Sequence, residues 1–273
     1  MAGRTLTKLH ALALALLVGA APAAADVLSP EARGAEVVIL GEVHDNPEHH
    51  RLQAAAVAEI APTALVFEMI AKGMGAEVDA LRAAGAGRDE IAEALDWAAS
   101  GWPDFALYAP ILEAAPGARI FGAARPRAEV RRAFAEGAAE VFGPEAARFG
   151  LDHPLPPEEQ AAREALQFDA HCAAMPREMM AGLVAAQRFR DAAFASAVLR
   201  AVEETGGPVV LITGNGHART DWGVPAALDH ARPDLSVHAV GMLEAAADAP
   251  PFDSWHVTDA PERGDPCAAL TGG

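Results

Sequence analysis

The sequence predicts an α/β fold with a mainly parallel central sheet, helices on both faces and a helical cap inserted between strands. Short apolar runs rich in β-branched residues alternate with helical stretches. The runs are apolar almost throughout, which is typical of strands that are buried on both faces of a parallel sheet. Alternation of this kind favours right-handed crossovers between parallel strands.

The apolar runs define the predicted strands in chain order. They contain the sequences "AEVVILG", "TALVFEM", "ARIFGAA", "PVVLITG" and "SVHAVGM". These strands are expected at residues 35–41, 63–69, 118–124, 208–214 and 236–242, with residues 254–259 as a candidate sixth strand.

The helices between these strands have recognisable start and stop signals. After the first strand, Asn46 is a suitable N-cap and Pro47 suits the first helical position. Two longer blocks, residues 72–116 and 126–205, have helical character and are expected to form the cap. The second block ends at residues 206–208, where the sequence Gly-Gly-Pro is typical of a helix C-terminus.

The first 25 residues have the pattern of a secretory signal peptide. A basic start is followed by the apolar stretch "LHALALALLVGA" and by "APAAA", whose small residues are typical of a cleavage site. We therefore expect a single domain, residues 26–273, that is periplasmic or otherwise exported and soluble after cleavage. No cysteine lies near residue 26 for lipid attachment, and no later apolar run reaches the roughly 18 residues of a membrane span.

The charge of the chain limits its partners. It contains 21 basic and 38 acidic residues and has a formal net charge of −17. Such an acidic excess disfavours binding to nucleic acid and to anionic membrane surfaces. Nucleic acid is therefore not an expected partner.

Cys172 and Cys267 are the only cysteines. In an oxidising compartment two cysteines favour a disulfide, which here would join the C-terminal tail to an internal helix. The sequence alone leaves this pairing open, because it does not place the two Cα atoms within bridging distance. No CxxCH motif occurs, which excludes covalent haem attachment of the c type.

Polar residues that can act as ligands lie at the ends of three predicted strands. The first strand leads into Glu42 and His44, the second contains Glu68, and the fourth leads into His217. Ligands of open α/β sheets bind outside the carboxyl ends of the strands. We therefore expect these four side chains to meet in one crevice. Each also has a structural interpretation, because a histidine after a strand can simply hydrogen-bond its own loop.

Glu68 requires a partner if it is buried. It interrupts the apolar run "LVFEMI", and a carboxylate at the edge of a core is costly unless it is paired. Arg51 and Arg125 are candidate structural partners. The motifs GxSxG and HExxH are both absent, which argues against a serine hydrolase of the nucleophile-elbow type and against a helix-borne zinc protease.

His49, His50 and Arg219 are further candidate binding residues. The two histidines lie in the first turn of a predicted helix, where the helix dipole disfavours added positive charge. "GNGHART" supplies glycines for a close backbone approach, and Arg219 suits a carboxylate or phosphate group. The segment lacks the complete patterns of dinucleotide-binding and phosphate-binding loops.

Together these motifs resemble the ChaN-like haem-binding uptake family, which shares a superfamily with Tiki proteases and erythromycin esterases. The resemblance is carried by "LGEVHDNPEHHRLQ", "LVFEM", "DAHCAAMP", "AQRFRDA" and "ITGNGHARTDWGVP", and spans residues 35–245. It implies a single ChaN-like domain with a parallel-sheet core and paired G-x-x-H motifs, which are Gly41–His44 and Gly214–His217 here. Family members are often lipoproteins, and this chain departs from that pattern.

The first function implied by the resemblance is an exported haem- or iron-binding protein for haem or iron uptake, with haem held between the two chains of a homodimer. The expected haem-contacting residues are His44, His49, His50, Tyr108, His217 and Arg219. The family implicates a tyrosine in iron ligation, and Tyr108 is the only tyrosine in this chain. His44, His49 and His50 are the alternative ligands, since neutral imidazole commonly ligates haem iron.

The second candidate function is a metal-dependent Glu/His hydrolase of the Tiki or erythromycin esterase type. His44, Glu68 and His217 would bind a divalent metal ion, or would orient water together, while Glu42 would act as general base. A structural export protein with a vestigial site is the third candidate. The sequence leaves open whether the chain is an enzyme.

Overall fold

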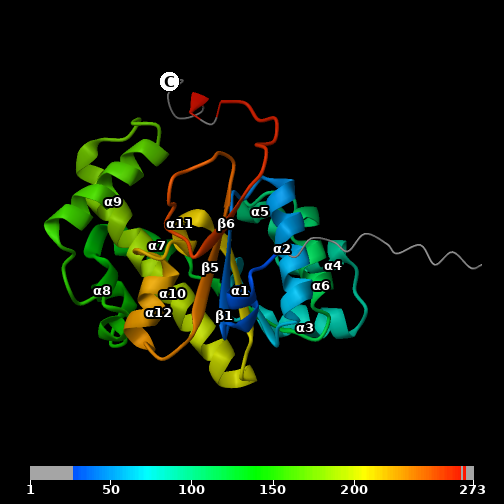
Figure 1. Ribbon diagram of the computed structural model, residues 1–273. Coiled ribbons are helices and arrows are strands. Elements are labelled where there is room, and N and C mark those ends of the chain that lie inside the picture. The colour runs from blue at the N-terminus through cyan, green and yellow to red at the C-terminus, as the bar shows by residue number, and fades with distance from the viewer. Residues whose placement is uncertain (1–26, 266, 269–273) are drawn as a thin grey trace, which may run out of the picture.

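A single parallel sheet forms the centre of the computed structural model, which describes residues 27–265, 267 and 268. The predicted signal peptide lies outside these residues. The sheet has six strands in the order β3-β2-β4-β1-β5-β6 (Figure 1). The strands are β1 (Val37–Glu42), β2 (Ala64–Ala71), β3 (Arg119–Ala124), β4 (Val209–Gly214), β5 (Val237–Leu243) and β6 (Ser254–Val257). Every neighbouring pair is parallel.

The predicted α/β fold class and all predicted strands, including the candidate sixth, are confirmed. The main difference is β2, which continues to Ala71 and has a register irregularity against β3 between Phe67 and Ala71. Gly122 of β3 permits this irregularity, because a Cβ there would lie 2.1 Å from the Ala71 carbonyl oxygen. A larger residue at this position would force the two strands apart.

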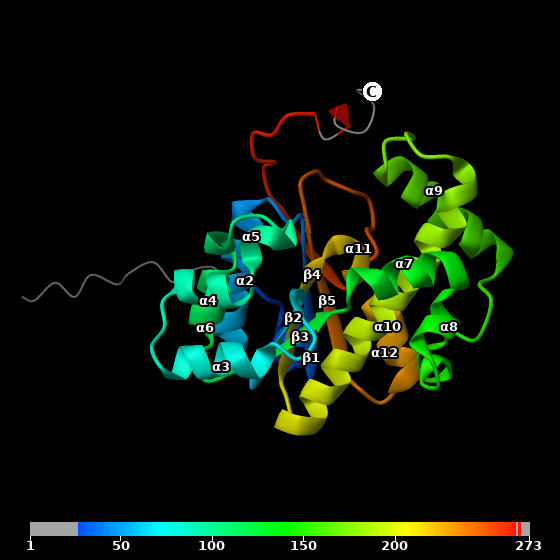
Figure 2. The same cartoon turned by 180° about the vertical axis from the view of Figure 1, so that it is seen from behind.

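Helices cover both faces of the sheet (Figures 1 and 2). One face carries α1 (Pro30–Gly34), α2 (Pro47–Ile60), α3 (Gly75–Ala83), α4 (Arg88–Ala94), α5 (Trp97–Ser100), η1 (Phe105–Leu107) and α6 (Ala109–Ala114). The other carries α7 (Arg127–Glu136), α8 (Ala138–Phe142), η2 (Ala146–Phe149), α10 (Met180–Thr205) and α12 (Val224–Ala231). The remaining helices are α9 (Pro157–Ala170), η3 (Arg177–Met179) and α11 (Asn215–Ala218). None of the helices in the described part of the chain has the length and apolarity needed to cross a membrane.

The alternation of side chains along β1 explains the two hydrophobic layers. Val37 and Ile39 point into the core beneath α10 and α12, whereas Val38 and Leu40 point into the core beneath α2 and α6. All four side chains are fully buried. A strand in the middle of a sheet that is covered on both faces must be apolar at every position, which is the pattern seen in the sequence.

The loop at residues 244–253 joins the parallel strands β5 and β6 without a helix. It folds back onto β5, where a Cβ on Gly241 would lie 2.4 Å from the Phe252 ring. The Asp253 amide and carboxylate both hydrogen-bond the backbone of Ala239. This loop is therefore held against the sheet and forms a wall near its carboxyl edge.

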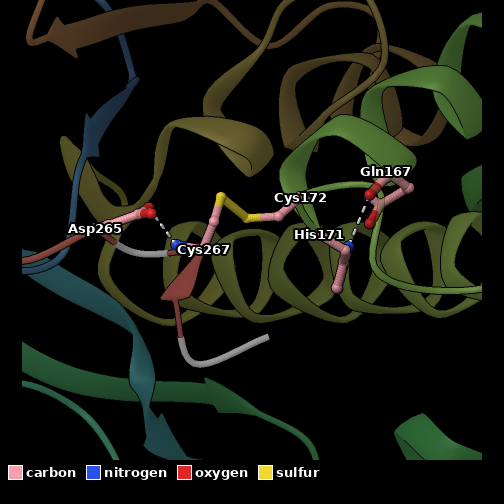
Figure 3. The surroundings of a disulfide bond; sticks show 5 residues. All are labelled: Gln167, His171, Cys172, Asp265 and Cys267. Atoms are coloured by element: carbon pink, nitrogen blue, oxygen red, sulfur yellow. Dashed lines mark hydrogen bonds between the residues drawn. A yellow bond between two sulfur atoms is a disulfide. The ribbon is translucent and has the colours of Figure 1, made fainter. Parts of the chain in front are cut away.

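The C-terminal tail is attached to the domain at two points. Arg263 forms ion pairs with Asp45 and Glu244, both near the carboxyl edge of the sheet. Cys267 forms a disulfide with Cys172, just after α9, with a Cα–Cα distance of 5.6 Å, which settles the pairing that the sequence left open (Figure 3). The tail therefore extends from β6 to the end of α9, above the carboxyl edge (Figure 1).

Candidate functional site

The ends of three neighbouring strands bring the predicted site residues together. Glu42 ends β1, Glu68 lies near the end of β2, and β4 between them leads through Gly214 into His217 on α11. His44 Nδ1 lies 2.6 Å from Glu42 Oε1, and His217 Nε2 lies 3.6 Å from Glu68 Oε1. The four side chains therefore form one polar group at the carboxyl edge, as the strand-end rule predicts.

Gly214 is the point at which the two halves of this group meet. A Cβ on Gly214 would lie 2.8 Å from His44 Nε2 and 3.7 Å from Glu68 Oε2. The absence of a side chain at this position lets the His44 ring pack beside the carboxylate of Glu68. A side chain at this position would displace the His44 ring from its place beside Glu68.

The buried carboxylate of Glu42 is surrounded by His44, His50 and Tyr108. Its Oε1 accepts hydrogen bonds from Tyr108 Oη at 3.1 Å and from His44 Nδ1. Its Oε2 lies 3.4 Å from His50 Nδ1. His50 Nε2 donates to the His44 carbonyl oxygen at 2.9 Å, so this carbonyl fixes the proton of His50 on Nε2.

Glu68 is buried with a complete set of hydrogen-bond donors. Arg190 of α10 pairs with Oε1, while Thr213 Oγ1 and the Gly214 amide donate to Oε2 at 2.6 and 2.8 Å. Burial by itself raises the pKa of Glu68, but the charges of His217, Arg190 and His44 and the Thr213 hydrogen bond outweigh it and lower the pKa to about 2. Glu68 is therefore a fixed anion.

The partner of Glu68 differs from both candidates suggested by the sequence. Arg51 pairs with Glu48 on the exposed side of α2, and Arg125 pairs with Glu129 on α7. Arg190 takes the role instead, because α10 packs against β2 and β4.

His217 is positioned by α10. Its Nδ1 lies 2.6 Å from Asp191 Oδ1 and 3.1 Å from Gln187 Nε2, and its ring packs on Phe194. Burial raises the pKa of Asp191, although the charge and hydrogen bond of His217 act in the opposite direction. Gln187, Arg190 and Asp191 were not assigned to this site from the sequence. Their spacing of three to four residues with Phe194 is the available signal, since it places them on one face of α10.

His44 is the partly exposed member of the polar group, with 32% of its side chain accessible. Its ring packs against Trp102, with 4.8 Å between the ring centroids. Burial lowers its pKa, but the hydrogen bond to Glu42 and the charges of Glu68 and Glu42 have a larger opposite effect, so the pKa is raised overall. His44 is therefore suited to carry a proton beside two carboxylates.

His49, His50 and Tyr108 lie inside the protein. His49 accepts a hydrogen bond from the Val43 amide through Nδ1 and pairs through Nε2 with Thr258, so both of its ring nitrogens are used. Burial lowers the pKa of His49. Tyr108 is 1% exposed, and burial raises the pKa of its phenol far above the ordinary value. In this arrangement neither His49 nor Tyr108 presents a free atom to a ligand.

Two cavities lie at the carboxyl edge, and Arg190 lines both. The α9 cavity has a volume of about 560 Å³ and lies between α9, α10, α11 and the loop at 244–253. Its apolar lining includes Leu166, Val184, Trp222, Leu243 and Phe252, and its polar lining includes Arg163, His171, Gln187, Arg190 and Arg219. The α7 cavity has a volume of about 390 Å³ and is lined by residues that include Glu68, Trp102, Arg125, Arg127, Arg131 and Phe194.

Arg219 lies at the α9 cavity rather than in the polar group of Glu42 and Glu68. Its guanidinium stacks on the Trp222 ring at 3.9 Å and forms two hydrogen bonds with Asp221 through Nε and Nη2. The two donors on Nη1 are not used by these contacts. Arg219 can therefore contact an additional anion.

The metal set considered from the sequence is not formed as a site. Among the described residues, no group of three or more His, Cys, Asp or Glu side chains could hold a metal ion, and this includes His44, Glu68 and His217. The reason is that both oxygens of Glu68 are engaged by Arg190, Thr213 and the Gly214 amide, while His217 is held by Asp191.

Comparison with known proteins identifies similar sequences and folds. The family model described as "Haem-binding uptake, Tiki superfamily, ChaN" matches residues 28–228. No match was found among curated proteins. Among solved structures, "Cofacial heme binding to ChaN of Campylobacter jejuni" aligns with a TM-score of 0.64 and 18% identity, covering 81% of this chain and 86% of that chain. The type III effector HopBA1 aligns with a TM-score of 0.46 and 14% identity, covering 84% and 90% of the two chains.

Proposed function

Because the chain belongs to the haem-binding uptake family of the Tiki superfamily that includes ChaN, we propose that it binds haem in the α9 cavity as an exported protein of haem or iron uptake. The observation that carries this proposal is an apolar cavity with arginines among its lining residues, located at the carboxyl edge of the sheet of a protein of this family. Open α/β sheets bind their ligands at this edge.

The size and lining of the α9 cavity fit a porphyrin. Its volume of about 560 Å³ lies within the range of roughly 300–1,000 Å³ that is typical of small-molecule sites. A porphyrin is a flat apolar ring, and Leu166, Val184, Leu243 and Phe252 offer apolar contacts to it. Burial of a ring of this size from water supplies most of the free energy of binding.

The arginines of the cavity fit the two propionate groups of haem. Arg190 donates to Glu68 through Nη2, and Arg219 donates to Asp221 through Nε and Nη2. Each guanidinium has five N–H donors, so each retains donors for a second carboxylate. Arginine pairs with carboxylates more specifically than lysine does, because its donors form a planar fork.

The disulfide supports an exported location. Cys172 and Cys267 are bonded in the folded chain, and structural disulfides persist in oxidising compartments such as the periplasm. This agrees with the signal-peptide pattern of the first 25 residues, which lie outside the described part.

We also propose that two haem-loaded chains associate. The Campylobacter jejuni ChaN structure is described by cofacial haem binding, and in this chain Leu166 lines the α9 cavity while 40% exposed. An apolar side chain at a cavity rim can contact a second ligand or a second chain. Size-exclusion chromatography with light scattering should show a monomer without haemin and a dimer with it. An unchanged mass would contradict the association but leave haem binding intact.

A haemin titration tests the proposed binding. The chain should shift the Soret absorbance of haemin to a saturating end point. Ala170→Trp adds a large ring at an exposed position that lines the α9 cavity and should weaken binding by about tenfold or more. Ala162→Trp is the matched control, since Ala162 is also exposed on α9 but does not line the cavity. Absence of a Soret shift, or equal affinity of the two variants, would contradict the proposal.

A further inference from the structure

His171 is the one histidine among the described residues that line the α9 cavity. It lies at the C-cap of α9, directly before Cys172 of the disulfide. The described lining contains no tyrosine, cysteine or methionine, so no other side chain there belongs to a type that commonly ligates haem iron.

The hydrogen bonds of His171 leave one ring nitrogen available. Its Nδ1 lies 2.7 Å from the carbonyl oxygen of Gln167 (Figure 3). A carbonyl oxygen only accepts, so Nδ1 carries the proton and the lone pair of the neutral ring lies on Nε2. Metal-binding histidines are typically oriented in this way, with the other ring nitrogen donating to a backbone carbonyl.

The turn that carries His171 is held in an uncommon backbone conformation. Cys172 and Ala173 have φ values of +57° and +53°, which are rare for residues other than glycine. Amides of the turn donate to the carbonyl groups of Phe168 and Asp169, and the disulfide joins the turn to the tail. Uncommon conformations that are held by their surroundings often position functional groups.

The other candidate ligands are engaged elsewhere. Tyr108 donates to Glu42, and His49 uses both ring nitrogens within the protein. His217 is held between Asp191 and Glu68, and His44 pairs with Glu42 through Nδ1. None of these four side chains lines the α9 cavity.

From these observations we propose that His171 Nε2 would ligate the iron of a haem bound in the α9 cavity. This assignment rests on the proposed haem binding. It differs from the tyrosine ligation implied by the family resemblance, because the single tyrosine of this chain is buried against Glu42. The disulfide and the Gln167 carbonyl act as positioning groups, since they fix the turn and the ring.

The test uses the disulfide-intact chain loaded with haemin and compares ferric absorbance and electron paramagnetic resonance spectra. His171→Ala should lose the signature of nitrogen ligation. Its affinity should fall by at least the roughly 10–100-fold that is typical of losing a supporting group at a metal site. Added imidazole should restore the spectrum of His171→Ala by occupying the empty coordination position. A purely structural role of His171 would not respond to imidazole.

His153→Ala serves as the control. His153 is exposed in the loop before α9 and does not line the α9 cavity, so this variant should keep the spectrum of the unsubstituted chain. The conservative variant His171→Gln should reproduce the spectral loss and exclude a folding effect of the alanine. A nitrogen-ligated spectrum in both His171 variants would overturn the assignment while haem binding stands. No Soret shift in the unsubstituted chain would overturn the proposed function and this assignment with it.

Discussion

Glu42 ends β1 and Glu68 lies near the end of β2, and the surroundings of these two buried carboxylates differ. Both carboxylates are almost completely buried, at 2% and 1% exposure. Glu68 has a guanidinium, a hydroxyl and a backbone amide as donors. Glu42 has His44, His50 and Tyr108 around it, and no arginine or lysine makes an ion pair with it in the described part of the chain. One charge is permanently compensated, whereas the other depends on the protonation of its neighbours.

As a consequence, the contact between Glu42 and His50 lacks a hydrogen atom that could form a hydrogen bond between them. Glu42 Oε2 and His50 Nδ1 lie 3.4 Å apart, and neither forms a hydrogen bond with any described group. His50 Nε2 already donates to a carbonyl, so a neutral His50 would direct a lone pair at the carboxylate. A proton on either atom satisfies both groups, and buried polar groups are generally satisfied.

The largest expected effect is a loss of stability when the ion pair of Glu68 with Arg190 is removed. Arg190→Met removes the cation and leaves a buried carboxylate without its ion pair. Loss of one partner of a buried pair typically destabilises a protein by about 3–5 kcal/mol. The free energy of unfolding from urea titration should fall by this amount.

Arg119→Met is the matched control for Arg190→Met. Arg119 pairs with Glu204 on the surface, and an exposed pair is worth about 1 kcal/mol or less. Equal losses of stability in the two variants would show that the ion pair with Arg190 does not stabilise the buried Glu68 carboxylate.

Much of the fold and the grouping of the site could be predicted from the sequence. The strands were recognisable because a parallel sheet buried on both faces requires continuous apolar runs, as in Val37–Leu40. The meeting of Glu42, Glu68 and His217 followed because parallel strands end at one edge. These inferences need only local patterns and one topological rule.

The partners of the site residues could not be predicted in the same way. Arg190 and Asp191 come from a helix whose packing angle and register against β2 and β4 are tertiary properties. Tyr108 lies in an amphipathic segment whose inward face becomes known only when α2 and η1 are placed together. Residue propensities also do not predict the turn at Cys172, because the residues with positive φ angles there are not glycines.

The second prediction uses pH to separate the two carboxylates. The pKa of Glu68 is lowered from 4.5 to about 2, so its ion pair stabilises the fold fully above pH 4.5 and is lost as the pH falls toward 2. The linked loss of stability is on the order of 3 kcal/mol. Urea unfolding at a series of pH values should show this decline in the unsubstituted chain.

Glu68→Gln provides the reference for the pH series. It is less stable at neutral pH, but it cannot lose the contribution that comes from ionisation of Glu68. The difference in unfolding free energy between the two proteins should therefore shrink as the pH falls from 4.5 toward 2. Parallel curves through this range would contradict the depressed pKa of Glu68.

The smallest expected effect is a loss of stability when the hydrogen bond of Tyr108 to Glu42 is removed. Tyr108→Phe removes one buried hydrogen bond to Glu42 and should cost about 1–3 kcal/mol. A double-mutant cycle with Glu42→Gln should show a coupling free energy of about 0.5 kcal/mol or more, because the two groups are in direct contact. The same variant should keep the Soret shift of the haemin complex, since Tyr108 is 1% exposed and does not line the α9 cavity. A haemin spectrum that collapses in Tyr108→Phe, with little change in unfolding free energy, would instead make this tyrosine an iron ligand. It would also mean that Tyr108 moves away from Glu42 and becomes accessible when haem binds.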